Sequence, residues 1–246
     1  NDCSLRGAIM KANADPANIY TITFPAGPTT YTLTQDNEIP DDETIRDLDV
    51  MVNMMIRGSG SDNTIINGNG YRPFHIHDGA TVLIEGVSIS NGYTYDAEGG
   101  GGILNEGTWL AVRDSSLSLN QSESYGGAIA NYGSYLNIDN VIFDNNVSND
   151  GDDAQNLSTE CGGALYLSEL GTVVINRSTF AENESQWGGG AVCQNSGEVV
   201  VRDSTFDGNT SIGAAATDTG GGAFYTNDGG FSTTSTIVRS TFTQNE

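Results

Sequence analysis

Short segments in which apolar and polar residues alternate run along most of the chain. Residues 135–139 read Tyr-Leu-Asn-Ile-Asp, and residues 81–89 read Thr-Val-Leu-Ile-Glu-Gly-Val-Ser-Ile. A period of two is typical of a strand with one face turned inward, whereas a helix would repeat its apolar residues every three or four positions. The pattern therefore predicts a series of short strands through these segments.

A glycine pair followed by a small residue and a large apolar one recurs five times. Each copy is followed by a strand and then by an apolar residue, two spacers and an asparagine, and the five asparagines are separated by 26, 37, 26 and 36 residues. Such recurrence is the signature of a repeat architecture. The glycine pairs lie at 100–101, 126–127, 162–163, 189–190 and 221–222, and the asparagines are Asn120, Asn146, Asn183, Asn209 and Asn245.

A unit of about 25 residues is too small to bury its own apolar face, so successive units must stack. Strands that pair with their equivalents in the next coil, at ~4.8 Å, form a parallel β-helix. A propeller blade would need about 40 residues, and a leucine-rich repeat would need a different spacing of leucines. We therefore predict an all-β fold, with glycines at tight corners and with asparagines and phenylalanines stacked from coil to coil.

The first residues have a different pattern. Leu5, Ile9 and Ala12 share one helical stripe with Ala8, and Ser4 is suited to the N-cap position. We expect a short helix within residues 1–18 that covers the open end of the stack, irregular coils over 19–98, and repeat coils over 99–246, all in a single domain 1–246. We also expect this domain to be part of a longer chain.

The opening residues and the repeats resemble two families of bacterial surface proteins. The start, Asn-Asp-Cys-Ser-Leu-Arg-Gly-Ala-Ile-Met-Lys-Ala-Asn, is similar to the C-S-L-R-E-A-I-x-x-A-N start of CSLREA-type surface proteins, with Gly7 in place of glutamate. The G-G-A-[ILV] and F-x-x-N pairs, such as 126–129 with 143–146, resemble the repeats of chlamydial polymorphic outer-membrane proteins. Leu117 replaces one phenylalanine and Gly102 one alanine.

These resemblances cover nearly the whole chain. They imply a right-handed, single-stranded parallel β-helix with a short N-terminal capping helix. They also imply an exported, cell-surface protein used for adhesion or assembly. They bring no catalytic residue with them.

The charge balance narrows the range of partners. The 246 residues carry 32 acidic and 9 basic side chains, a net charge of −23 at pH 7. Such a charge repels nucleic acid and anionic lipid, and it attracts divalent cations. No apolar run approaches the ~18 residues of a membrane-spanning helix. We expect a secreted or cell-surface location with no membrane span in this segment and no nucleic-acid partner.

The three cysteines, Cys3, Cys161 and Cys193, allow at most one disulfide. In the repeat alignment Cys161 precedes its glycine pair, whereas Cys193 follows the next one. That separates them by about five residues along neighbouring strands, about 16 Å at ~3.3 Å per residue, which is too far for a disulfide. We therefore expect them to be unpaired, small buried hydrophobes.

The candidate calcium site lies in the long insert that follows Asn146. There Asn149, Asp150, Asp152 and Asp153 crowd oxygen ligands around a glycine, and calcium takes six to eight oxygen ligands. The spacing does not match an EF-hand loop, and a solvated loop is the alternative. No other cofactor is expected. A second insert, 210–219, leaves the repeat at the same corner, so both inserts are expected on one side of the stack.

His75 and His77 flank Ile76 on a predicted strand, so both rings are expected to share one outward face. Two histidines are suited to a transition metal, although no third ligand is evident in the sequence. The alternative is that they are the solvated exterior of one coil.

Aromatic side chains suggest a surface for glycan binding, since sugars stack on tyrosine and tryptophan rings. Tyr166 and Tyr225 share one repeat position. Tyr125 and Trp187 lie just before glycine corners. Packing beneath the loops would explain the same residues. The four residues are the candidate ligand surface.

Three functions remain open at this stage. The favoured one is a non-catalytic structural or adhesive module whose partner is a glycan or another host- or cell-surface ligand. The second is a filament subunit that associates end to end, one chain's open end on the next chain's helix. The third is a calcium-assisted polysaccharide lyase or a glycoside hydrolase. The recurrence of Arg113, Arg177, Arg202 and Arg239 in successive coils favours exterior charge pairing over catalysis.

Overall fold

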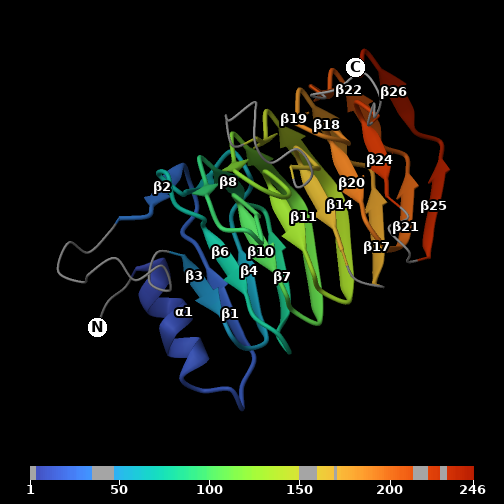
Figure 1. Cartoon of the computed structure of the whole chain (residues 1–246). Helices are drawn as coiled ribbons and strands as arrows, with labels where there is room; N and C mark the ends of the chain where they lie inside the picture. The colour runs from blue at the N-terminus through green and yellow to red at the C-terminus, as the bar shows by residue number, and fades with distance from the viewer. Residues whose placement is uncertain (1–3, 35–46, 150–159, 169–170, 213–220, 228–231) are drawn as a thin grey trace.

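The chain winds into a stack of coils whose strands form three sheets along its length (Figure 1). The computed structural model describes residues 4–34, 47–149, 160–168, 171–212, 221–227 and 232–246. Each strand pairs in parallel with the equivalent strand one coil away, as β11 (Trp109–Ser118) does with β14 (Tyr135–Asp144). The predicted all-β parallel helix is confirmed.

Sheet A is the largest of the three and has fourteen strands. Its main path contains β1 (Tyr20–Thr23), β4 (Met54–Arg57), β7 (Thr81–Glu85), β11, β14, β17 (Thr172–Asn176), β21 (Gly197–Arg202) and β25 (Thr233–Val238). Beside that path lie β2 (Thr29–Thr32), β5 (Thr64–Asn67), β8 (Ser88–Ser90), β18 (Thr179–Ala181), β22 (Thr205–Asp207) and β26 (Thr241–Thr243).

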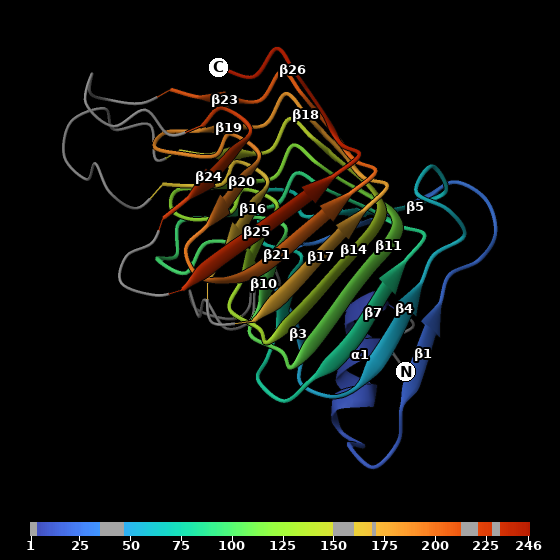
Figure 2. The ribbon, with the colours of Figure 1, turned by 90° about the vertical axis from the view of Figure 1, so that its right-hand side faces the viewer.

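Sheets B and C close the other sides of each coil, as the view along the stack shows (Figure 2). Sheet B consists of β3 (Leu48–Val50), β6 (Phe74–Ile76), β10 (Ile103–Asn105), β13 (Ile129–Asn131), β16 (Leu165–Leu167), β20 (Val192–Gln194) and β24 (Phe224–Thr226). Sheet C consists of β9 (Tyr93–Thr94), β12 (Gln121–Ser122), β15 (Val147–Ser148), β19 (Glu184–Ser185) and β23 (Thr210–Ser211).

The described residues contain one helix, α1 (Leu5–Asn13), which lies at the N-terminal end of the stack. Ser4 is its N-cap, and its side chain accepts a hydrogen bond from the Gly7 amide. The stripe predicted from the sequence is buried, with Leu5, Ile9 and Ala12 in the core. Asn13 bonds the backbone of the edge strand β3, because its Nδ2 donates to the Asp49 carbonyl over 2.7 Å. The helix therefore covers and partly satisfies an exposed sheet edge.

Phenylalanines and asparagines stack inside the tube as the repeats predict. The rings of Phe143, Phe180, Phe206 and Phe242 follow one another at centroid distances of 4.6, 4.7 and 4.6 Å. The repeat asparagines form a continuous ladder of side-chain amide bonds from Asn120 to Asn245. Each Nδ2 also donates to a backbone carbonyl, so the buried amides are satisfied.

The corners combine expected and unexpected residues. Gly126, Gly162 and Gly189 have positive φ, and a Cβ on Gly163 would collide with the Gly190 carbonyl oxygen of the next coil. At the bend between the two halves of sheet A, however, non-glycine residues take the left-handed conformation, including Asn140 (φ 55°) and Arg177 (φ 49°). Asparagine and aspartate tolerate that region, but arginine gives no such signal in a sequence.

Candidate functional site

One row of outward-facing residues runs along all seven strands of sheet B. Cα pairing places these residues one above another, coil after coil. The first two are an acid and a histidine, and the later ones are apolar or aromatic. In order the row is Asp49, His75, Leu104, Ala130, Tyr166, Cys193 and Tyr225.

An open pocket of about 530 Å³ lies over the first three coils of this row. We call it the acidic pocket. Five of its side chains are acidic, two are histidines and one is an arginine, so it strongly favours cations. They are Asp47, Asp49, Asp96, Glu98 and Glu106, His75 and His77, and Arg72.

Strand β6 positions the two histidines side by side. Phe74 and Ile76 point into the core, so His75 and His77 both face outward, as predicted. Their rings stack with centroids 3.8 Å apart. The sequence prediction of a shared face is therefore confirmed.

Carboxylates from the coils on either side contact both rings. His77 Nε2 lies 2.7 Å from Asp49 Oδ1, and His75 Nε2 lies 2.8 Å from Glu106 Oε2. Asp49 comes from the coil before the histidines and Glu106 from the coil after. Asp49 is thus a third side chain of a metal-ligating type beside the two histidines, and it precedes His75 by 26 residues, which is one repeat period.

A buried arginine, Arg72, links three segments that line the acidic pocket. Arg72 Nε lies 3.3 Å from Asp47 Oδ2, its Nη1 donates to the Gly99 carbonyl over 3.1 Å, and its Nη2 pairs with Asp96. Burial raises the pKa of the Asp47 carboxyl above its usual value, and the Arg72 charge opposes that rise. The loop that carries Asp96 is therefore tied to the sheet.

The four residues of the candidate ligand surface lie near the far end of the same face. Tyr166 is only 6% exposed and stacks against Tyr125 at a centroid distance of 4.2 Å. The Tyr225 ring lies against Gly188, and the Trp187 amide donates to the Glu160 carbonyl. Tyr166 thus packs beneath its neighbours, whereas Tyr125, Trp187 and Tyr225 are half-buried and present part of their surface. Glycan binding by these rings stays a prediction.

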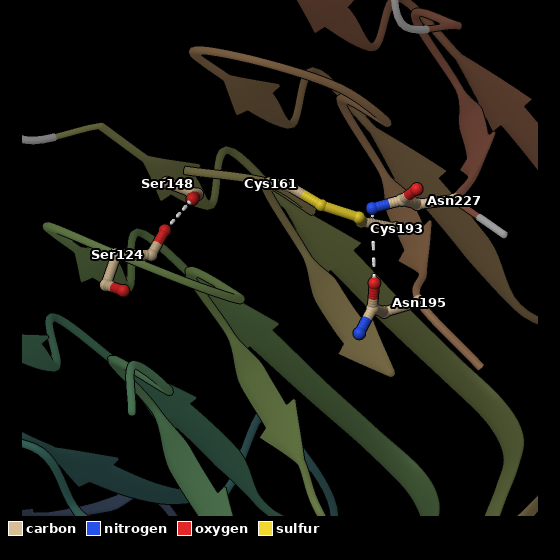
Figure 3. Close-up of a disulfide and its surroundings, with 6 residues drawn as sticks. All are labelled: Ser124, Ser148, Cys161, Cys193, Asn195 and Asn227. Atoms are coloured by element: carbon tan, nitrogen blue, oxygen red, sulfur yellow. Dashed lines mark hydrogen bonds between the residues drawn. A yellow bond between two sulfur atoms is a disulfide. The ribbon is translucent and has the colours of Figure 1, made fainter. Parts of the chain in front are cut away.

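Cys161 and Cys193 form a disulfide, so the expectation of unpaired cysteines is wrong (Figure 3). Their Cα atoms are 5.6 Å apart, within the range of roughly 4.4–6.8 Å that a disulfide needs. The estimate of 16 Å treats the chain as straight, but the glycine corner at 162–163 lies between the two positions. The corner turns the chain, so Cys161 lies beside Gly188 and over the outer face of sheet B.

Most of the candidate calcium site lies outside the described residues. Asn149 is described, and its amide donates to the Ser122 carbonyl over 2.9 Å, while Asp150, Asp152 and Asp153 are not. Both inserts do leave the stack from sheet C, because they follow β15 and β23, which occupy one position two coils apart. Calcium binding there stays a prediction.

The exterior arginines pair with acids in adjacent coils. Arg177 Nη2 lies 2.6 Å from Asp139 Oδ2, and Arg239 makes two bonds to Asp203, of 2.6 and 2.7 Å. These contacts confirm exterior charge pairing for Arg177 and Arg239.

The sequence matches the family model described as right handed beta helix region over residues 44–246. The chain belongs to this family. The family supports the right-handed winding but not the closer resemblance to the CSLREA-type or chlamydial proteins, which stays a prediction. No curated protein and no solved structure matches the chain.

Among the described residues, no helix has the length and apolar character needed to cross a membrane. End-to-end assembly also stays a prediction.

Proposed function

We propose that this β-helix is a non-catalytic display module, exported to the cell surface or beyond, that binds a glycan or another cell-surface ligand on the outer face of sheet B. The observation that carries the proposal is the contrast between the two faces of that sheet. The first inward position is apolar in all seven strands, from Leu48 to Phe224. The outward row changes its chemistry from coil to coil.

This contrast is what a scaffold for recognition requires. The uniform interior keeps the coils in register, while the outward residues at the two ends of the row, Asp49 and Tyr225, are partly exposed and differ in chemistry. The aromatic cluster around Tyr125 and Tyr225 supplies ring faces, and the acidic pocket supplies charge. Both lie on the outer side of sheet B, where six coil-to-coil steps at ~4.8 Å each separate Asp49 from Tyr225 by about 30 Å.

The disulfide supports the proposed location. Disulfides persist in oxidising compartments and are rare in the reducing cytosol. The Cys161–Cys193 bond therefore favours an exported protein. The high acidic excess agrees with a protein that stays soluble outside the cell.

The binding test uses the purified chain on an array of acidic and neutral glycans and on intact cells. We expect binding that is weakened by Trp187→Ala or Tyr225→Ala. Trp109→Ala is the matched control, because Trp109 stacks with Tyr135 on sheet A, away from sheet B. An absence of binding to every glycan and cell, or an equal loss in the control, would contradict the proposal.

A second candidate, glycan hydrolysis, is favoured by one observation. Asp47, whose pKa is raised by burial, lies two residues from the more exposed Asp49 in the acidic pocket. Glycosidases use two carboxyl groups beside the scissile bond, and one of them is an acid whose pKa is raised. Incubation with glycans should then release reducing ends, and Asp47→Asn should abolish the release. A lyase would instead give unsaturated products, and the absence of both products removes the enzymatic candidate.

A further inference from the structure

Asp49, His75 and His77 bring three metal-ligating atoms together on the floor of the acidic pocket. One nitrogen of each ring and one Asp49 oxygen all lie within 4.8 Å of one another. The three residues come from two adjacent strands whose register places Asp49 directly beside His75. The backbone pairing of β3 and β6 therefore holds the set in place before any ion binds.

The hydrogen bonds of His75 leave one nitrogen facing negative charge. His75 Nε2 lies 2.8 Å from Glu106 Oε2, within hydrogen-bond distance. The other ring nitrogen, Nδ1, faces the carboxylates of Asp49 and Asp47. It lies 3.9 Å from Asp49 Oδ1 and 4.0 Å from Asp47 Oδ2, too far for a hydrogen bond. His75 Nδ1 thus lies close to two carboxylate oxygens with no hydrogen bond joining it to either of them.

The distances from Asp49 Oδ1 to the two rings, 3.9 Å to His75 Nδ1 and 2.7 Å to His77 Nε2, suit a transition-metal ion. Zinc binds imidazole nitrogen and carboxylate oxygen at about 2.0–2.2 Å, so one ion bridges ligand atoms up to about 4 Å apart. The Asp49 Oδ1 atom is shared, since it also lies 2.7 Å from His77 Nε2, where an ion would replace the bridging proton. Two imidazoles and one carboxylate form a donor set of zinc or a similar late divalent metal, whereas calcium prefers oxygen ligands alone.

Glu106 occupies the position of an outer carboxylate. Metal-bound histidines usually donate their second ring N–H to a carboxylate, which fixes the tautomer and the ring orientation. Glu106, from the following coil, is the carboxylate that lies 2.8 Å from His75 Nε2. We treat it as a positioning residue and not as a ligand.

We propose that Asp49, His75 and His77 bind one divalent transition-metal ion of the zinc class, with Glu106 orienting His75. The set leaves room for a fourth ligand from the open side of the pocket, such as water. The assignment does not depend on the proposed binding of a surface ligand or on glycan hydrolysis.

The test measures metal binding by the full chain in the absence of any glycan. After removal of metals with a chelator, Zn²⁺ is titrated by calorimetry, and Co²⁺ is added to record the visible absorption that nitrogen ligation produces. We expect one ion per chain. Asp49→Asn and His77→Gln should each abolish the cobalt spectrum, and Glu106→Gln should weaken zinc binding about 10- to 100-fold.

Glu198→Gln is the matched control, since it removes one exposed carboxylate from sheet A and should leave binding unchanged. Metal-free circular dichroism and melting curves establish that each variant is folded. The proposal is overturned if the chain binds no zinc, or if Asp49→Asn and His77→Gln both bind it as the parent does. The latter result would place the ion elsewhere, for example in the insert that contains Asp150.

Discussion

Asn146 Nδ2 donates to Asn183 Oδ1 over 2.9 Å, although the two residues are 37 positions apart in the sequence. The Asn146 amide N–H also donates to the same oxygen, over 3.0 Å. The side-chain oxygen of Asn183 therefore accepts hydrogen bonds from both the backbone and the side chain of Asn146 in the preceding coil. The 37-residue spacing includes the long insert between these two asparagines, and yet the asparagine ladder continues from Asn146 to Asn183 without a break.

Replacement of one ladder residue should destabilise the whole stack. Asn183→Ala removes the acceptor for two Asn146 donors and leaves buried groups unsatisfied in two coils. Each unsatisfied buried group costs about 1–3 kcal/mol, so we expect a loss of several kcal/mol in the free energy of unfolding. Urea unfolding measures it. Asn195→Ala is the control, because Asn195 accepts only a long bond of 3.3 Å at the surface, and it should change little.

The phenylalanine stack predicts an effect that depends on position. Phe180 is fully buried between two other rings, so Phe180→Ala should lower the free energy of unfolding by about 3–5 kcal/mol. Phe242 is 41% exposed and stacks on one ring only. Phe242→Ala should therefore cost clearly less, and equal losses at the two sites would argue against a continuous internal stack.

The disulfide should contribute to stability through the 32-residue separation that it closes. Loop-closure entropy for that length gives about 3–4 kcal/mol. Unfolding with and without reductant measures the difference in the parent chain. In a Cys161→Ala, Cys193→Ala double variant, reductant should have no further effect. If both cysteines react as free thiols in the protein before any reductant is added, the pairing is wrong.

We expect the free energy of unfolding to change at alkaline pH because of the Tyr93 hydroxyl. Its hydrogen bond to the Glu123 carboxylate raises the pKa of Tyr93 to about 12. The folded state therefore holds this proton more tightly than the unfolded chain, in which tyrosine has a pKa near 10. Stability from this group is complete below about pH 10 and is lost as the pH rises toward 12. The ultraviolet titration curve of the parent, after subtraction of the curve of Tyr93→Phe, should show the Tyr93 hydroxyl ionising near pH 12. Glu123→Gln should shift that ionisation back toward about pH 10.

Much of the fold is predictable because the repeats report it directly. The glycine pairs and the spaced asparagines specify corners and ladders, and the outward pair His75 and His77 follows from alternation alone. The disulfide is missed because a straight-strand estimate ignores the corner at 162–163. The Asp49 contact is missed because the coils before residue 99 lack the glycine and asparagine motif that marks the later coils. The Glu106 contact is missed because the motif does not show which side chain of the next coil reaches His75. Alignment by one period would have placed Asp49 beside His75.

The central claim is that the coils lie one above another in register and share one outer face. Spin labels test it at Thr81, Glu198 and Thr234, which occupy one exposed column of sheet A. Cysteines are introduced there in a chain whose Cys3 is replaced by serine, and pulsed electron resonance measures the distances. Coils stacked in register should give about 19 Å for Thr81 to Glu198 and about 24 Å for Thr81 to Thr234, at ~4.8 Å per coil. Distances that do not increase from the first pair to the second, or that far exceed these values, would contradict the stack.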